Sequence, residues 1–252
     1  MKTGLKRWAL SFLGAALLLA HGSPAMAGGI NLAWNDCGGA GGAVNRNFAC
    51  ATNVGDNDLY ASFDPPMTLT TVNGNILIID LQSAWPTLPQ WWQFKNPGTC
   101  RLASLIANGG PGSCVDPWQG QGSPGIGAYF TNANVPAMPL NRARIVGSIA
   151  VASAFAGQVD PGTEYFSMVF RINNAKTVGM GACAGCQDPV CIVLTEIVIT
   201  QPPGTPGGSP KLHNPLVSLY ATWQGGAINT FGCPGGSPTV NRTWGQLKGL
   251  YR

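Results

Sequence analysis

Charged side chains are scarce in this 252-residue chain, at 10% of the sequence against about 25% in a typical globular domain. Three of the 14 basic residues lie in a predicted leader, so that 11 oppose 10 acidic residues in the remaining chain. Nucleic acids and anionic membranes are bound by basic surfaces that neutralise their phosphates. This balance therefore predicts neither nucleic acid nor a membrane surface as the partner.

Histidine is also nearly absent, which restricts the catalytic chemistry that the chain can perform. Beyond the predicted leader only His213 remains, and a serine nucleophile needs such a base. His213 follows a Pro/Gly-rich stretch, and the chain contains no G-x-S-x-G nucleophile elbow. We therefore expect no enzyme, no cofactor and no metal.

Most of the ten acidic residues fall in turn-like sequences, where Asp favours the local backbone. Asp80 and Glu196 are exceptions, because each interrupts an apolar, strand-like segment. A pair of carboxylates can hydrolyse a glycosidic bond. Alternatively, these two acids face solvent or pair with an arginine. Asp56 and Asp58 offer oxygen ligands for calcium, but the full calcium-loop pattern is missing, and a plain Asn/Asp turn is the alternative.

No apolar run is long enough to span a bilayer, which takes about 20 residues. The longest, Trp8 to Ala20, follows a basic start and precedes Ala25-Met26-Ala27. These are the parts of a secretory signal peptide. We predict a signal peptide over 1–27, cleavage near Ala27, and a secreted mature chain, extracellular or periplasmic, that does not insert into a membrane.

Eight cysteines follow the predicted cleavage site, and an even number in an exported chain indicates disulfides. Proximity in sequence predicts the pairs Cys37–Cys50 and Cys100–Cys114. Of the remaining four, Cys183 or Cys186 would close onto Cys191 and leave a longer bridge to Cys233. A redox pair in the C-x-x-C segment and an all-cysteine zinc knuckle are the alternatives. The predicted disulfide cysteines are Cys37, Cys50, Cys100, Cys114, Cys183, Cys186, Cys191 and Cys233.

Apolar residues alternate with polar ones in many short segments, and alternation with period two is typical of half-buried β-strands. The 35 glycines and 20 prolines supply frequent turns between them. We predict an all-β protein in which 28–252 forms one disulfide-bonded β-sandwich domain, immunoglobulin-like or jelly-roll-like, with long Gly/Pro-rich loops. Expected strands are 30–34, 48–52, 59–63, 76–82, 92–95, 128–131, 142–151, 164–172, 190–200 and 217–223, with a short helix over 243–251.

Tryptophan and glutamine gather in one part of the chain, and their combination can hold a sugar between ring faces and amide groups. Tryptophan also anchors protein interfaces. Alternatively, the rings fill the core, since tryptophan is highly buried on average. The candidate ligand-binding residues are Trp85, Trp91, Trp92, Trp118, Gln93 and Gln119.

Four segments resemble a group of uncharacterised secreted bacterial proteins with paired cysteines: Asn31–Cys37, Trp91–Lys95, Gly181–Cys186 and Thr243–Lys248. This resemblance covers nearly the whole mature chain and implies no known activity. The segment Val159–Tyr165 is similar to cohesin-like and other immunoglobulin-like sandwiches.

The sequence therefore predicts a secreted, non-enzymatic protein that acts by binding or by surface assembly, with a glycan or an extracellular protein as its partner. Two alternatives remain. One is a carbohydrate-binding module that uses the Trp/Gln-rich segment. The other is a secreted hydrolase with an unrecognised acidic site.

Overall fold

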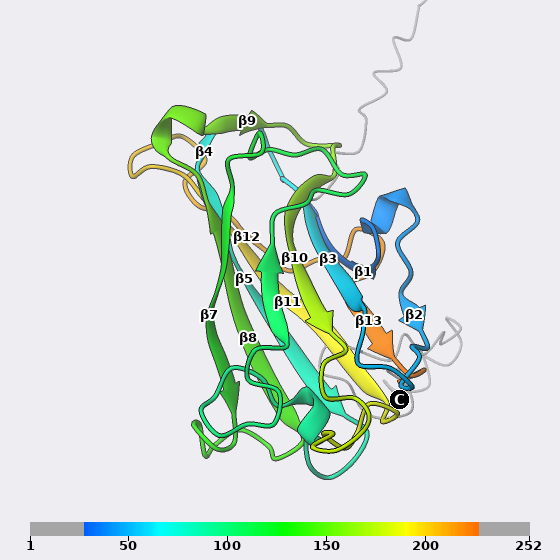
Figure 1. Cartoon of the computed structure of the whole chain (residues 1–252). Helices are drawn as coiled ribbons and strands as arrows, with labels where there is room; N and C mark the ends of the chain where they lie inside the picture. The colour runs from blue at the N-terminus through cyan, green and yellow to red at the C-terminus, as the bar shows by residue number, and fades with distance from the viewer. Residues whose placement is uncertain (1–27, 227–252) are drawn as a thin grey trace, which may run out of the picture.

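A computed structural model describes residues 28–226. The predicted signal peptide, Cys233 and the expected helix over 243–251 lie outside the described residues. The described chain forms an all-β sandwich of two main sheets (Figure 1), which confirms the predicted fold class.

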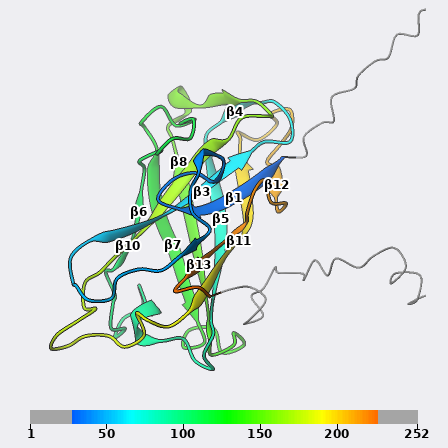
Figure 2. The ribbon, with the colours of Figure 1, turned by 90° about the vertical axis from the view of Figure 1, so that its right-hand side faces the viewer.

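The smaller main sheet has four antiparallel strands in the order β1-β3-β10-β6, which Figure 2 shows side by side. In that order the strands are Gly29–Trp34, Asp56–Asp64, Tyr165–Asn173 and Leu105–Asn108.

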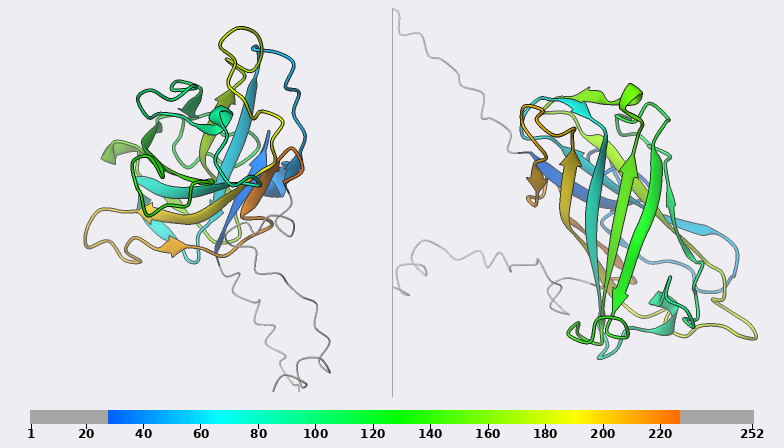
Figure 3. Two further views of the ribbon diagram at one scale, coloured as in Figure 1. Left: turned by 90° about the horizontal axis from the view of Figure 1, so that it is seen from below. Right: turned by 90° about the vertical axis from the view of Figure 1, so that its left-hand side faces the viewer.

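The larger sheet has seven strands, six of them in the order β2-β13-β11-β5-β8-β7, while β12 pairs with β11. Its strands β5, β8 and β7 run side by side in the right-hand view of Figure 3. In path order the six are Asn45–Arg46, Tyr220–Trp223, Val190–Thr200, Gly74–Ser83, Arg142–Ala150 and Ser123–Thr131, and β12 is Lys211–Leu212. Strands β4 (Leu69–Val72) and β9 (Gly157–Val159) form a separate pair.

The core lies between the two main sheets and follows the alternation in the sequence. On β5, Leu77, Ile79 and Leu81 are buried, and on β8 so are Ala143 and Ile145. The side chains between them point to the outer face, because successive residues of a strand alternate sides. β11 lies between β13 and β5, as expected for a strand that is apolar on both faces.

Two expected strands, 48–52 and 92–95, are not formed. The second overlaps a short 3₁₀ helix, η2 (Gln90–Trp92). Both segments contribute rings to a buried aromatic cluster, in which Phe48 stacks on Trp223 with ring centroids 4.0 Å apart. Packing of these large side chains, rather than β-pairing, holds the two segments in place.

Both predicted local disulfides are wrong. The bonds are Cys37–Cys114, Cys50–Cys186 and Cys100–Cys183, with sequence separations of 77, 136 and 83. Cys183 and Cys186 therefore do not close onto Cys191, which is itself disulfide-bonded. Loop-closure entropy grows only slowly with loop length, so nearness in sequence is a weak guide to pairing. The bonds join loops that are far apart in the chain and that the sandwich brings together, and they indicate an oxidising environment.

Candidate functional site

Three of the four tryptophans predicted to form a binding surface are buried in the core. Trp91 and Trp92 are 0% exposed and Trp118 is 1% exposed. The indole N–H of Trp91 donates to the Thr177 hydroxyl at 3.0 Å, and that of Trp118 donates to the Ser167 carbonyl at 3.1 Å. These buried rings belong to the core. A sugar can stack only on a ring face that reaches solvent, so these three rings offer no sugar contact.

The other members of the predicted surface are dispersed. Trp85 is 53% exposed in the loop that follows β5. Gln93 is half-buried, and its amide donates to the Leu88 carbonyl at 2.9 Å. Gln119 is exposed next to the buried Trp118. Of the expected rings, Trp85 alone reaches solvent substantially, so the Trp/Gln-rich segment offers one aromatic contact instead of a row.

Asp80 and Glu196 share the outer face of the seven-stranded sheet, on the neighbouring strands β5 and β11. Asp80 lies opposite Val193, and Glu196 lies opposite Ile78. A β-bulge between Leu194 and Glu196 sets this register, so the two acids occupy diagonal positions, which lie about 7–8 Å apart between strands.

Each of these acids is occupied by a basic partner. Both oxygens of Asp80 accept from Arg144, at 2.6 and 2.8 Å. Glu196 Oε2 lies 3.6 Å from both Lys211 Nζ and His213 Nε2, while His213 Nδ1 lies 3.1 Å from the Thr195 carbonyl. Asp80 is therefore held by two short hydrogen bonds, whereas Glu196 has only two longer contacts with basic side chains.

Asp56 and Asp58, the candidate calcium ligands, also have a basic partner. Arg171 binds both oxygens of Asp58, at 2.7 and 2.8 Å, and its Nε lies 3.8 Å from Asp56. This pairing raises the pKa of Arg171. Within residues 28–226, no group of three or more His, Cys, Asp or Glu side chains is arranged to hold a metal ion.

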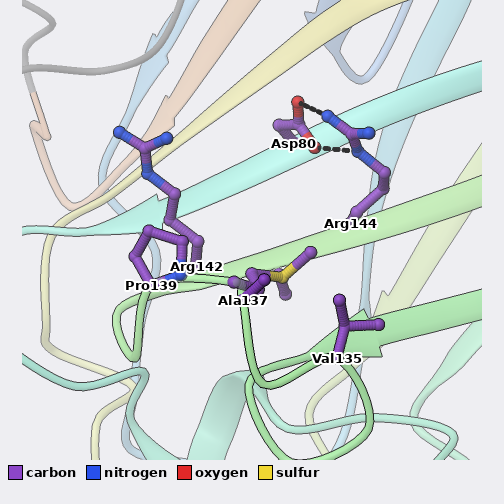
Figure 4. A pocket seen from close by; sticks show the side chains of 8 residues that line it. Asp80, Val135, Ala137, Pro139, Arg142 and Arg144 are labelled. Atoms are coloured by element: carbon purple, nitrogen blue, oxygen red, sulfur yellow. Dashed lines mark hydrogen bonds and ion pairs between the residues drawn. The ribbon is translucent and has the colours of Figure 1, made fainter.

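A hollow of about 240 Å³ opens beside Asp80, between strand β8 and the loop that precedes it (Figure 4). Charged side chains from β5 and β8 form one side of it, and apolar loop residues form the other. The residues that line it are Asp80, Val135, Ala137, Met138, Pro139, Arg142, Ala143 and Arg144.

The apolar side of the hollow is preformed by asparagines of the loop 132–141. The Asn132 amide donates to the carbonyls of Pro136 and Met138, at 3.0 and 2.7 Å. Asn134 accepts from the Thr131 amide at 2.7 Å and donates to the Tyr129 carbonyl at 3.0 Å. These bonds add to the backbone turns of the loop, in which the Val135 amide donates to the Thr131 carbonyl at 2.9 Å and the Met138 amide donates to the Val135 carbonyl at 2.8 Å, and together they fix the loop beside β8.

The charged side of the hollow combines one paired and one unpaired arginine. The hydrogen bonds that Arg144 donates to Asp80 raise the pKa of Arg144. Arg142, two residues earlier on the same outer face, is half-buried and has no side-chain acceptor among the described residues (Figure 4). Its guanidinium carries five N–H donors and is the open polar group of the hollow.

Sequence patterns identified part of this site. The outward alternation of Arg142 and Arg144, and the unusual position of Asp80 in an apolar strand, are both visible in the sequence, and pairing of Asp80 with an arginine was one expectation. The register of β5 and β8, which places Asp80 opposite Arg144, supplies the partner. The sequence does not distinguish the loop 132–141, because its Asn and Pro residues are typical of any surface turn.

Comparisons with protein-family models, with curated proteins and with solved structures gave no match. The resemblance to uncharacterised secreted proteins and the immunoglobulin-like or jelly-roll-like assignment therefore stay predictions. Between residues 28 and 226 there is no helix of sufficient length and apolar character to cross a membrane.

Proposed function

We propose that this protein is a secreted, non-enzymatic binding protein, and that its ligand occupies the hollow beside Arg142 on the outer face of the seven-stranded sheet. The observation that carries this proposal is a depression lined by apolar loop side chains and by Arg142, whose guanidinium has no acceptor in residues 28–226 (Figure 4). Binding sites combine an apolar lining with a few oriented polar groups in this way.

Binding is favoured over assembly through strand addition because the accessible sheet edges are obstructed. The nine-residue edge strand β7 contains Pro124, which has no N–H, and a bulge between Ile126 and Ala128. The Asn134 side chain forms hydrogen bonds with the carbonyl of Tyr129 and the amide of Thr131, so these two backbone groups already have a partner. Proteins use such features to prevent edge-to-edge pairing.

The edge of β1 is covered by the chain itself. Its Ile30 and Leu32 amides donate to the carbonyls of Asn214 and Ser218, both at 2.8 Å, and the Leu216 amide donates back to Ile30 at 3.0 Å. An incoming strand would have to displace this segment. The remaining path-end strands, β6 and β2, contain four and two residues, which is little for an added strand to pair with.

A glycan contact through Trp85 is the second candidate, and the exposure of its ring favours it. A Trp85→Ala variant would then lose the fluorescence response of the wild type to a panel of neutral oligosaccharides. A wild-type response that is flat across the panel, or equal in the variant, would remove this candidate.

The main proposal is tested with exported protein in which the methionine methyl groups are ¹³C-labelled. Met138 lines the hollow and reports on it, whereas Met180, fully exposed on a separate loop, is the internal control. The probes are neutral monosaccharides, alkylamines and short carboxylic acids.

We expect at least one probe class to shift the Met138 signal without moving that of Met180, and to be recovered chemically unchanged. An Ala137→Trp variant, which fills the hollow from the exposed loop, should lose this response while melting as the wild type does. If no class moves the Met138 signal, the hollow is not a binding site.

A further inference from the structure

We infer that the hollow recognises a monocarboxylate attached to a compact apolar group, with Arg142 as the residue that selects the carboxylate. This inference rests on the proposed binding function and adds the chemical class of the ligand. It follows from the charge balance of the lining, from the geometry of the open guanidinium and from the character of the opposite side.

The charge balance of the lining favours a ligand with one negative charge. The lining contains two arginines and one aspartate, and Asp80 already neutralises Arg144 through two short bonds. One positive charge remains, on Arg142. A singly charged anion compensates it, whereas a dianion would leave an excess negative charge beside Asp80.

The geometry of the open group favours a carboxylate over a spherical anion. Arg142 and Arg144 leave β8 two residues apart, on the same face, and are therefore separated by about 7 Å along the strand. Arg144 has its Nε and Nη2 directed at Asp80. The planar fork of Arg142 is left to make the same two parallel N–H···O bonds with a ligand carboxylate.

The opposite side requires an apolar body on the ligand. Val135, Ala137, Met138 and Pro139 contribute no polar side-chain atoms, and the loop that carries them is held by Asn132. The hydroxyl groups of a sugar acid would find no side-chain hydrogen-bond partner on this side, which makes the contact less favourable than that of an apolar group. An apolar cavity of about 150 Å³ holds benzene, so a hollow of 240 Å³ accepts a group of ring size beside the carboxylate.

The experiment compares three probes that separate charge from apolar character. The first, 3-phenylpropanoate, carries both features. The second, 3-phenylpropanamide, keeps the shape but lacks the charge, and the third, glucuronate, keeps the charge but lacks the apolar body. Affinities are measured by titration of the Met138 methyl signal at neutral pH in the wild type, in Arg142→Gln and Arg142→Lys, and in a matched control, Arg46→Gln. Arg46 lies on β2, at the other end of the sheet.

We expect 3-phenylpropanoate to bind at least about tenfold more tightly than either other probe, since a charge-assisted bond contributes a factor of this size. Arg142→Gln should lose at least about tenfold, Arg142→Lys should lose less because it keeps the charge without the planar fork, and Arg46→Gln should match the wild type.

Three results would overturn the inference: equal affinity for the amide, equal affinity for glucuronate, or wild-type affinity in Arg142→Gln. If the Met138 signal responds to amines or neutral sugars and not to 3-phenylpropanoate, the binding function stands and the carboxylate assignment fails. If it responds to no probe at all, the binding function itself fails.

Discussion

Replacement of the buried Arg101 tests how the end of the sandwich with the aromatic cluster is held together. Arg101 is 1% exposed, and no carboxylate of the described chain lies against its guanidinium. The group donates instead to three backbone carbonyls, those of Ala175, Trp91 and Asn173, the first two at 3.1 and 2.8 Å. Its Cζ lies 3.5 Å from the ring centroid of Trp91.

The expected size of the effect follows from these contacts. Burial lowers the pKa of Arg101 to about 9, so the side chain is still charged at neutral pH. Arg101→Met leaves three carbonyls without this donor, at about 1 kcal/mol or more each, and removes a desolvated cation–π contact of about 2 kcal/mol. Methionine avoids the desolvation of the charge, which offsets part of the loss. We expect a net loss of about 3 kcal/mol in unfolding free energy.

Urea unfolding followed by circular dichroism measures this difference, and the melting temperature should fall by about 6–12 °C. The matched control is Arg142→Met, which removes an unpaired guanidinium from the surface and should change stability by less than about 0.5 kcal/mol. If Arg101→Met is as stable as this control, the carbonyl and ring contacts do not hold this end of the sandwich, and the reasoning is refuted.

Three further perturbations give expected outcomes. Asp80→Asn removes a negative charge beside the hollow and should tighten 3-phenylpropanoate binding about threefold, since two charges about 6 Å apart in water interact by about 0.7 kcal/mol; weaker binding in this titration would contradict the charge balance proposed for the site. Burial raises the pKa of Asp64 above 3.8, against opposing hydrogen bonds from the Gly162 and Thr163 backbone. Between the unfolded and the folded pKa of Asp64, the folded state binds more protons than the unfolded state. The contribution of Asp64 to stability is therefore lost as pH rises through the folded pKa. Asp64→Asn should flatten this decline in urea unfolding measured across the acidic range, and an unchanged slope would assign the decline to other groups. Replacement of both Cys50 and Cys186 by Ser should lower the unfolding free energy by about 5 kcal/mol, because the bond closes a long loop in the unfolded chain; peptide mapping without reduction should recover these two cysteines linked in the wild type, and recovery of Cys50 linked to another cysteine would contradict the pairing.

The main elements of the sandwich follow from local pattern. Alternation over 76–82 and 142–151 predicts strands with one buried face, and the structure buries Leu77, Ile79 and Ile145 as that pattern requires. This works because side chains of a strand alternate sides whatever the strand pairs with. The same rule fails for 92–95, where aromatic packing overrides the local preference for a strand.

Local sequence alone establishes the fold class, the abundance of turns and the use of cysteine for disulfides, since each depends on residue type and short-range order. Tertiary structure alone decides which cysteines meet, which tryptophans reach solvent, and that Asp80 pairs with Arg144 and leaves Arg142 without an acceptor in the described chain. Those outcomes depend on strand register and on contacts between segments far apart in the chain. A shift of one residue in the pairing of β5 with β8 would place a different residue opposite Asp80 without changing the alternating pattern of either strand.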